Sequence, residues 1–320
     1  MPISSTVDYI PVMDEFLAHW GALPEPLKLP EGETAVGFVE FTALRVELDV
    51  AKTELQRKLN DLEAARVHLE QARITGGDRI AEFNRRIRAE FPNTPGLSRL
   101  PAVPARTAGR DAFLDAMDDA LDLWNRVNAL PPGPVFTAPL LLRGGLSRDQ
   151  LLAMRVGLDR AFTQRGAADA AVFSQRLVRN LLQDRAKSLM ILYRMKIEAL
   201  HAPESFQVAT LPRVTPLPGS TPEPVALTAE WNEEAGRAEL TWTASEEPDL
   251  ASYQVRGVPG PEYSAEDETL MATLPPGGPR VWHSIAGLAV PGSAMSYKLY
   301  VRLATGHEAG SAPGTVTRPG

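Results

Sequence analysis

The octet MDDALDLW, residues Met117 to Trp124, has a counterpart near the start of the chain, MDEFLAHW at Met13 to Trp20. Methionine, leucine and tryptophan occupy matching places in both octets, separated by steps of four and three residues. Side chains with this spacing lie on one face of a helix. The octets therefore predict two short amphipathic helices whose tryptophans pack in a core, which favours a structural role over a chemical one.

The likeness of the two segments continues beyond the octets. Each tryptophan is followed by a proline-rich loop, Leu23 to Gly32 in the first segment and Leu130 to Gly145 in the second. A helix start comes next, at Thr34 and at Ser147, and Ser147 with Gln150 fits a capping box. Each loop is therefore expected to lead into a long helical stretch.

The long stretches end in related sequences, FNRRIRAEF at Phe83 to Phe91 and YRMKIEALH at Tyr193 to His201, and each then reaches a Leu-Pro exit. The separation of equivalent residues grows from 104 at the tryptophans (20 to 124) to 111 at the exits (100 to 211). Loop insertions explain this drift. We therefore predict an internal duplication with repeats at about residues 6–101 and 110–211.

The first long stretch carries a heptad pattern that Lys58 interrupts once. Its two series of apolar positions are Phe41, Leu48, Leu55, Leu62 and Leu69, with Leu44, Ala51, Ala65 and Ala72 as companions. This pattern predicts a helical seam about 42 Å long at 1.5 Å per residue. Gly76 and Gly77 are expected to break or kink the helix before it resumes at Asp78.

The second long stretch has no glycine pair, and its apolar stripes are Phe173, Leu177 and Leu181, then Leu189, Tyr193 and Ile197. Two long amphipathic elements joined by proline loops are expected to pack together. The fold prediction for residues 1–211 is therefore an elongated antiparallel helical bundle.

The composition changes after Leu211, where five prolines fall between Pro212 and Pro224. This segment, residues 212–223, is predicted to be a stiff, extended linker. Beyond it, short alternating runs indicate strands, and together they predict a β-sandwich. The runs are AELTWTA at 238–244, SYQVRGV at 252–258 and SYKLYVRL at 296–303.

Residues 224–320 resemble a fibronectin type III domain, an immunoglobulin-like β-sandwich, through Pro224, Trp242, Tyr253, Leu288 and Tyr297. The resemblance implies that Trp242 is the buried tryptophan of the second strand and that Tyr297 pins the corner before the sixth strand. Four residues, 293–296, stand where the family usually has two, which puts the corner bond in doubt. The resemblance also implies a spacer or contact module rather than an activity.

Composition limits the possible chemistry and partners. The chain has no cysteine, which excludes disulfides, thiolate metal sites and cysteine nucleophiles. Its net charge of −7 comes from residues 219–320, which hold 13 acids and 6 bases, and this argues against a nucleic-acid partner. No stretch is long and apolar enough to span a bilayer. Without a secretory signal, a cytoplasmic location is expected, and non-classical export or a surface location stays open.

A search for active-site motifs identifies no catalytic, cofactor-binding or metal-binding residues. Asp111, Asp115, Asp118 and Asp122 form one acidic helix face that could hold a cation, but a solvated face is favoured. The histidines lack the spacing of zinc or di-iron sites; they are His19, His68, His201, His283 and His307. The glycine pairs in LRGGLS and ITGGDR lack the lysine of a phosphate loop.

The sequence therefore predicts a multidomain protein, mainly α plus all-β, with no enzymatic activity and no cofactor. The favoured function is structural: the helical bundle self-associates or scaffolds another protein and displays the β-sandwich as a contact module. The alternative is an adhesion protein, or a protein- or carbohydrate-binding protein, in which the bundle serves as a stalk.

Overall fold

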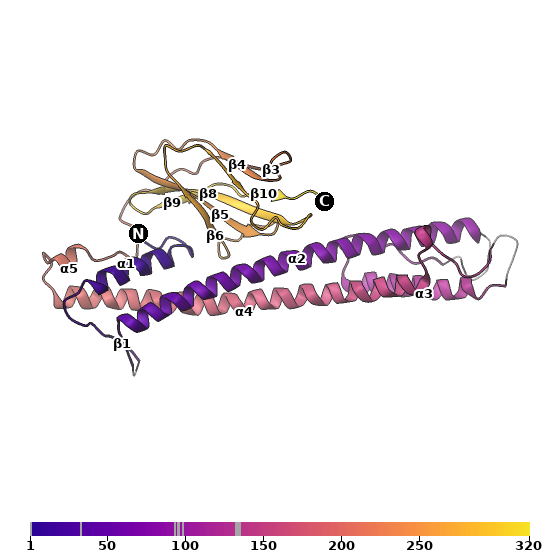
Figure 1. The fold of residues 1–320 in the computed structure, drawn as a ribbon, viewed down its shortest axis with the longest axis horizontal. Helices are drawn as coiled ribbons and strands as arrows, with labels where there is room; N and C mark the ends of the chain where they lie inside the picture. The colour runs from indigo at the N-terminus through magenta and orange to yellow at the C-terminus, as the bar shows by residue number, and fades with distance from the viewer. Residues whose placement is uncertain (1, 33, 93, 95–96, 98, 132–135) are drawn as a thin grey trace. The chain divides into compact units, whose positions relative to one another are not determined.

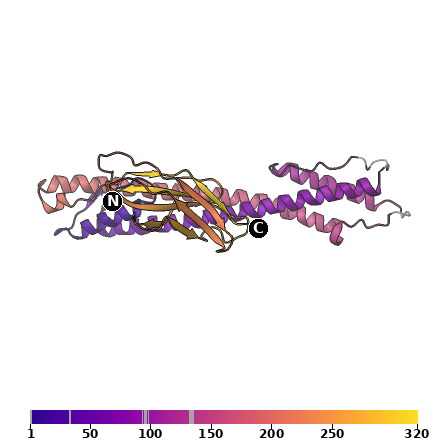
Figure 2. The same cartoon turned by 90° about the horizontal axis from the view of Figure 1, so that it is seen from above.

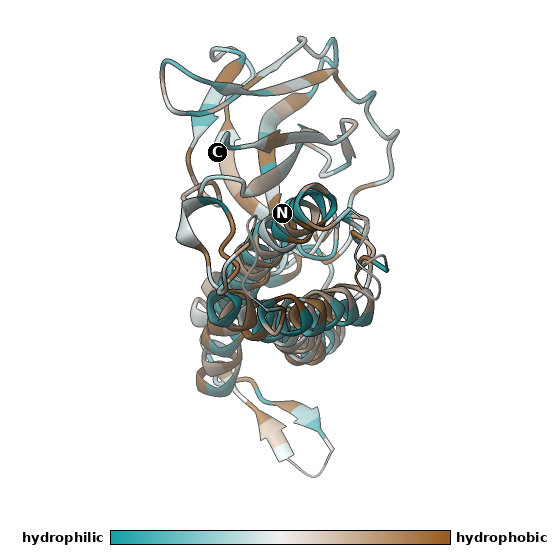
Figure 3. Ribbon diagram, turned by 90° about the vertical axis from the view of Figure 1, so that its right-hand side faces the viewer, coloured by the Kyte–Doolittle hydropathy of each residue, from teal (hydrophilic) through white to brown (hydrophobic). Residues whose placement is uncertain are grey.

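The computed structural model describes residues 2–320 except 33, 93, 95–96, 98 and 132–135. Helices dominate the first two thirds of the chain, and antiparallel strands make up the last third (Figure 1). The first part comprises α1 (Tyr9–Gly21), β1 (Leu29–Glu31), β2 (Thr34–Val36), α2 (Phe38–Glu90), α3 (Arg110–Asn128), a 3-10 turn (Arg143–Gly145), α4 (Arg148–Leu200) and α5 (Phe206–Ala209). In Figure 3 brown hydrophobic and teal hydrophilic residues alternate along the helices, as amphipathic helices show.

The chain divides into two compact units. The first unit contains residues 1–63 and 171–320, and the second contains residues 64–170. Both long helices, α2 and α4, run from one unit into the other, so each unit holds a stretch of each. The units divide the chain after residues 63 and 170, whereas the predicted domains divide it after residue 211 and before residue 224. The predicted domain boundaries remain predictions.

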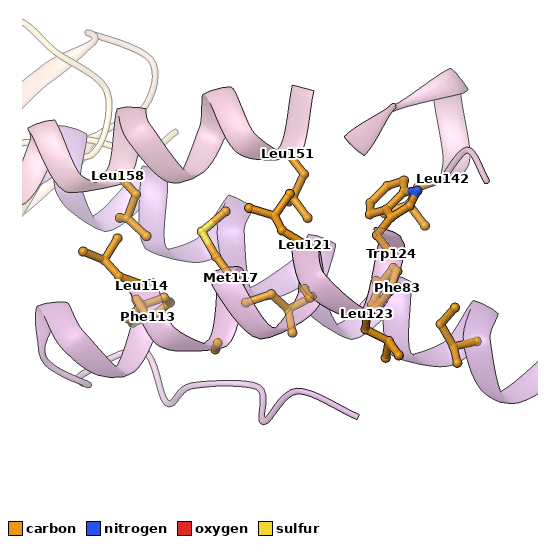
Figure 4. Close-up of a cluster of buried hydrophobic side chains, with 14 of the residues drawn as sticks. Phe83, Phe113, Leu114, Met117, Leu121, Leu123, Trp124, Leu142, Leu151 and Leu158 are labelled. Atoms are coloured by element: carbon orange, nitrogen blue, oxygen red, sulfur yellow. The ribbon is translucent and has the colours of Figure 1, made fainter. Parts of the chain in front are cut away.

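The core of the second unit forms around α3, whose apolar face is buried between α2 and α4 (Figure 4). The Trp124 ring stacks on the Phe83 ring of α2 with centroids 5.2 Å apart. The indole Nε1 of Trp124 donates a hydrogen bond of 3.1 Å to the carbonyl oxygen of Leu140. Trp124 is therefore a buried packing residue, as its octet predicts.

The helical core of the first unit forms around α1 in a similar way. Trp20 is buried, and its ring centroid lies 4.7 Å from that of Tyr193 in α4 and 5.6 Å from that of Phe41 in α2. Phe83 and Tyr193 begin the two related end sequences of the long helices. Each octet tryptophan thus contacts the end sequence that belongs to the other predicted repeat.

The helix starts were predicted with mixed success. The capping box at Ser147 is confirmed, since the Ser147 amide donates to Gln150 Oε1 (2.8 Å) and the Gln150 amide donates to Ser147 Oγ (3.3 Å). The predicted start at Thr34 is wrong, because Thr34 lies in β2 and α2 begins at Phe38. There the Glu40 carboxylate accepts a hydrogen bond from the Gly37 amide (2.9 Å). In the predicted loop 130–145, residues 132–135 lie outside the described residues.

The predicted break at Gly76 and Gly77 is also wrong, because α2 continues through both glycines. A Cβ atom on Gly76 would lie 3.7 Å from Met117 Sδ and 3.9 Å from Leu158 Cδ2. These are ordinary van der Waals distances, so the packing of α3 and α4 on α2 does not require glycine at this position. A glycine costs a helix only about 1 kcal/mol relative to alanine, so two of them need not end it.

The heptad seam of α2 is confirmed for most of its positions, and Leu59 is buried beside the interruption at Lys58. The buried members are Phe41, Leu44, Leu48, Ala51, Leu55 and Leu69. On α4, the stripe of Leu189, Tyr193 and Ile197 is buried as expected.

The expectation that the other α4 stripe also packs in the bundle is wrong, because its side chains lie in solvent. Phe173, Leu177 and Leu181 are 61%, 51% and 70% exposed. At this level of the helix the buried residues are instead Arg179 and Gln183. Arg179 meets Glu266 of the C-terminal region, and Gln183 donates to the carbonyl oxygen of Thr6.

The C-terminal region folds into two antiparallel sheets that share one core. The first sheet has the order β3-β4-β7, formed by β3 (Leu227–Asn232), β4 (Arg237–Trp242) and β7 (Val281–Ser284). The second has the order β10-β8-β5-β6 with β9 also paired to β8; its strands are β5 (Leu250–Pro259), β6 (Thr269–Leu274), β8 (Ala294–Leu303), β9 (Glu308–Gly310) and β10 (Gly314–Thr317).

The residues that carry the family resemblance lie mostly in the shared core of the two sheets. Trp242 is buried on β4, the second strand of the region, and its ring centroid lies 5.9 Å from that of Tyr253. Leu288 and Tyr297 are fully buried. The Tyr297 hydroxyl has no hydrogen-bond partner among the described residues, so the corner bond that the resemblance implies is not formed.

Candidate functional site

A buried network of charges on β5, β8 and β9 and at the residue just before β6 is the most unusual polar feature of the first unit. Strand β5 is buried on both faces: Tyr253 and Val255 enter the core between the sheets, and Gln254 and Arg256 point to the opposite face. Figures 1 and 2 show that this second sheet lies along α1 and the neighbouring stretches of α2 and α4. The helices therefore cover a sheet face that carries charge.

Arg256 is the centre of this network and has no exposed area. Its Nη1 atom lies 2.8 Å from Glu268 Oε1, and its Nη2 atom lies 2.6 Å from Glu308 Oε2. The guanidinium also donates to Gln254 Oε1 and stacks 3.9 Å above the Tyr300 ring. Burial opposes the charge of Arg256, but Glu308 and Glu268 raise the pKa of the guanidinium above its ordinary value.

Glu268 is further held by two tyrosine hydroxyls, which donate to its Oε2 atom from Tyr263 (2.6 Å) and Tyr300 (2.9 Å). Burial and the Glu268 charge raise the pKa of Tyr263 and raise that of Tyr300 to about 12. Both hydroxyls therefore stay protonated as donors at neutral pH. The network is satisfied internally, which is typical of a structural ion cluster.

Three further arginines join the sheet to the helical elements of the first unit. Arg176 on α4 contacts Asp267 with two hydrogen bonds of 2.8 and 2.5 Å, and Arg179 donates to the carbonyl oxygen of Glu266 (2.6 Å). From β8, Arg302 donates to Asp8 Oδ1 just before α1 (2.6 Å). These charge-assisted bonds fix the sheet on α1 and α4.

A cleft of about 620 Å³ opens beside this network in the first unit. Its wall includes Val7 and Ile10 from the N-terminal segment, Lys52 and Gln56 from α2, and Leu270 from β6. The Lys52 ammonium donates to the carbonyl oxygen of Thr6 (3.1 Å). Burial, with a smaller contribution from the Arg179 charge, lowers the pKa of Lys52 to about 8. The cleft thus combines apolar walls with an amine that loses its proton more readily than an ordinary lysine.

Two separate apolar stripes are exposed on the helices of the first unit. The α4 stripe is Phe173, Leu177 and Leu181, and the α2 stripe is Val46 and Val50; each lies on the side of its helix away from the contact between α2 and α4. The two helices lie side by side at this level, because Gln175 Nε2 donates to the carbonyl oxygen of Ala51 (3.1 Å). At about 100° per residue, Leu181 lies opposite the buried Arg179 on α4, and Val46 and Val50 lie opposite Leu48 on α2.

The acidic face predicted around Asp118 belongs to α3 in the second unit. The Asp118 carboxylate forms two hydrogen bonds with Arg155, of 3.0 and 2.9 Å, and Asp111, Asp115 and Asp122 are exposed. Among the described residues, no group of three or more acidic or histidine side chains is placed to hold a metal ion. The described helices also include none with the length and apolarity needed to cross a bilayer.

Three of the five histidines make polar contacts with neighbouring groups. His19 Nδ1 lies 2.6 Å from the Tyr193 hydroxyl, and His19 Nε2 lies 2.9 Å from the carbonyl oxygen of Gln207. His283 Nε2 lies 3.1 Å from Glu239 Oε2, and His307 Nε2 lies 2.7 Å from the carbonyl oxygen of Leu217. His19 thus joins α1 to α4 and to α5, whereas His283 and His307 each contact one neighbour.

Sequence reasoning missed both the ion network and the outward direction of the α4 stripe. The alternation of β5 would have identified Arg256 as a charged residue in the middle of a strand. Arg179 and Gln183 carry a weaker signal, because polar residues on the inward side of a helix cannot be recognised until the neighbouring acidic segment is known.

Comparisons with known proteins give little guidance. No family model and no curated protein matches the chain. An Fn3-like protein from Clostridium thermocellum is similar at 23% identity, over 32% of this chain and 97% of that chain, with a TM-score of 0.25. A pectate lyase from Pectobacterium carotovorum matches at 13% identity, over 29% of this chain and 27% of that chain, also with a TM-score of 0.25.

A pectate lyase from Erwinia chrysanthemi, solved with tetragalacturonic acid, matches at 16% identity with a TM-score of 0.25. The match covers 29% of this chain and 28% of that chain. The chain therefore spans little more than a quarter of either pectate lyase. At these TM-scores the likenesses carry no argument about activity.

Proposed function

We propose that the chain is a non-enzymatic structural or assembly protein that self-associates through its helices and holds a β-sandwich as a contact module. The two exposed apolar stripes of α2 and α4 carry this proposal. Their five large apolar side chains are each more than half exposed. Exposed apolar surface of this extent is typical of a protein–protein interface.

The β-sandwich is proposed to be of the fibronectin type III kind. The strand orders β3-β4-β7 and β10-β8-β5-β6, together with the buried Trp242, Tyr253 and Leu288, support this assignment. Its ion pairs with α1 and α4 suit a module that is held on the helices rather than one that swings on a linker.

The helical part is proposed to have arisen by internal duplication. Trp20 and Trp124 are both buried against an aromatic residue at the same place in the related end sequences. In both segments, two leucines of the proline-rich loop enter the same core as the tryptophan; they are Leu27 and Leu29 in one and Leu140 and Leu142 in the other.

Self-association is tested on the intact purified protein by light scattering and sedimentation velocity across a concentration series, with negative-stain electron microscopy of the highest concentration. We expect discrete oligomers or filaments that dissociate on dilution. A monomer at every concentration, up to the highest the protein reaches without precipitating, would refute the proposed function.

The alternative function is recognition of a partner by the acidic sandwich, and its exposed loop residues Ile285 and Val290 favour it. Deleting residues 219–320 is a poor test, since it would uncover Arg179 and Asp8, which the sandwich buries. Substituting Ile285 and Val290 by Asp keeps the chain intact. Loss of a partner's binding with self-association unchanged would support the alternative.

A further inference from the structure

One cation in the wall of the 620 Å³ cleft has no anionic partner among the described residues. This cation is Lys52 on α2, which forms no ion pair with any residue that the structure describes. The other charged side chains that line the cleft each have a partner: Asp49 with Arg45, Arg57 with Glu54, Arg179 with Glu266, Asp267 with Arg176 and Glu268 with Arg256. Their charges are thus already balanced within the protein, whereas that of Lys52 is not.

The Lys52 ammonium is held in place by one hydrogen bond. Its Nζ atom donates to the carbonyl oxygen of Thr6 (3.1 Å), which also accepts a hydrogen bond from Gln183 Nε2 on α4 (3.4 Å). An ammonium has three N–H donors, and no second acceptor for Lys52 lies among the described residues. Two donors therefore remain for an acceptor that enters the cleft.

Aliphatic side chains from three parts of the chain also line the cleft. Val7 and Ile10 come from the N-terminal segment, Leu55 and Leu59 from α2, and Leu270 from β6. The volume of the cleft falls in the range of about 300–1,000 Å³ that small-molecule sites usually have, and such sites combine apolar walls with a few polar groups. The cleft therefore suits a small amphipathic molecule that carries one anionic group.

We propose that this cleft binds a small aliphatic carboxylate, which accepts hydrogen bonds from Lys52 and lays its hydrocarbon chain on the aliphatic wall. A hydrogen bond between an ammonium and a carboxylate is charge-assisted, and one ammonium matches one carboxylate in charge. A phosphate monoester, with a charge of about −2, would be only half neutralised there, next to Asp49. This inference goes beyond the proposed self-association and does not depend on it.

The site should depend on pH, because Lys52 is the group that gives the carboxylate its partner. The charges that act on Lys52 are Asp49 on its own helix, Asp8 before α1, Arg179 on α4 and Arg256 on β5, beside the paired charges of the wall. Burial, and after it Arg179, lower the pKa of Lys52 to about 8. Ordinary carboxylates and guanidiniums do not titrate between pH 7 and 9. Carboxylate affinity should therefore fall about tenfold from pH 7 to pH 9, as Lys52 loses its proton.

Isothermal titration calorimetry of the intact protein at pH 7 tests the site with octanoate and with 1-octanol, which has the same chain length and no charge. We expect octanoate to bind at least about tenfold more tightly, because a hydrogen bond to a charged group adds to the binding of the chain. Equal affinities, or no octanoate binding, would overturn the proposal. Acetate that binds as tightly as octanoate would also overturn it, because the aliphatic wall would then contribute nothing.

The substitution Lys52→Met identifies the cation responsible. We expect its dissociation constant for octanoate at pH 7 to rise at least about tenfold and its affinity for 1-octanol to be unchanged. The control is Arg57→Met, which removes another cation from the wall of the same cleft and should leave octanoate binding unchanged. An equal loss in the two variants, or no loss in Lys52→Met, would overturn the assignment to Lys52.

A second substitution, Lys52→Arg, keeps the test decisive even if Lys52→Met does not fold. A guanidinium stays protonated to above about pH 12, so its charge does not change in the range of the experiment. We expect this variant to bind octanoate at pH 7 and to keep that affinity at pH 9, where the wild type has lost about tenfold. A wild-type affinity that does not fall between pH 7 and pH 9, or a fall that persists in Lys52→Arg, would overturn the role of Lys52.

Discussion

Arg256 illustrates how a single residue can hold a sheet face against helices. Removing the guanidinium by Arg256→Met leaves Glu268 and Glu308 buried without their cation. We expect the free energy of unfolding to fall by about 3–5 kcal/mol. The control is Arg57→Met, which breaks exposed pairs with Glu54 and Asp61 and should cost far less. Urea denaturation of both variants checks this, and similar losses would contradict the assigned role.

The two octet tryptophans differ in one hydrogen bond. Trp124 Nε1 donates to the carbonyl oxygen of Leu140, whereas Trp20 Nε1 is buried with no partner among the described residues. Replacement by Phe removes the donor in both cases, but only Trp124→Phe also leaves a buried acceptor unpaired. We expect Trp124→Phe to destabilise by about 1–2 kcal/mol more than Trp20→Phe. Thermal unfolding of the two variants measures the difference, and the reverse order would contradict it.

Lys52 gives the protein a pH dependence on the alkaline side. Burial lowers the pKa of Lys52 from 10.5 to about 8, so between these values the unfolded chain binds a proton that the folded chain has released. Stability therefore rises as the pH increases through this window. We expect the free energy of unfolding to increase from pH 7.5 to 9.5 more in the wild type than in Lys52→Met. A steeper increase in the variant would show that the sign is wrong.

At the level of helices and strands, the periodic segments were predictable because their pattern reports directly which face is buried. The octet helices, the α2 seam and the runs around Trp242, Tyr253 and Tyr297 follow local spacing. Thr34 was misread because a threonine that ends a proline loop fits a strand as well as an N-cap. The Phe173 stripe was misread because an apolar stripe does not say whether it meets the same chain or another.

Gly77 allows the continuity of α2 to be tested. A Cβ atom there would have nothing within 4 Å, and the residue lies inside a regular helix. We expect Gly77→Ala to stabilise the protein by about 0.5–1 kcal/mol through helix propensity. Denaturant unfolding measures this, with Gly144→Ala as a contrast, because Gly144 has a φ of 76° that alanine resists. Destabilisation by Gly77→Ala would indicate that the helix bends there.

At the level of the whole molecule, the sequence predicted helices followed by strands, with the change at the proline-rich segment after Leu211. It did not indicate which parts of the chain are compact together. The ion pairs of Asp8 with Arg302 and of Arg176 with Asp267 join residues far apart in sequence. Such contacts depend on how the folded helices and strands pack against each other, and no local sequence pattern predicts them.

Each octet tryptophan packs on the other predicted repeat, so cutting the chain between the repeats should not give two folded halves. Residues 64–170 form one compact unit, so a break near residue 105 severs both units and leaves each fragment with an incomplete hydrophobic interior. We expect fragments 1–105 and 106–320, poorly helical when separate, to reconstitute helicity when mixed in equal amounts. Circular dichroism of the mixture against the sum of the parts measures this complementation, and a purely additive spectrum would contradict it. Complementation would then mean that neither of the two predicted repeats folds without the other.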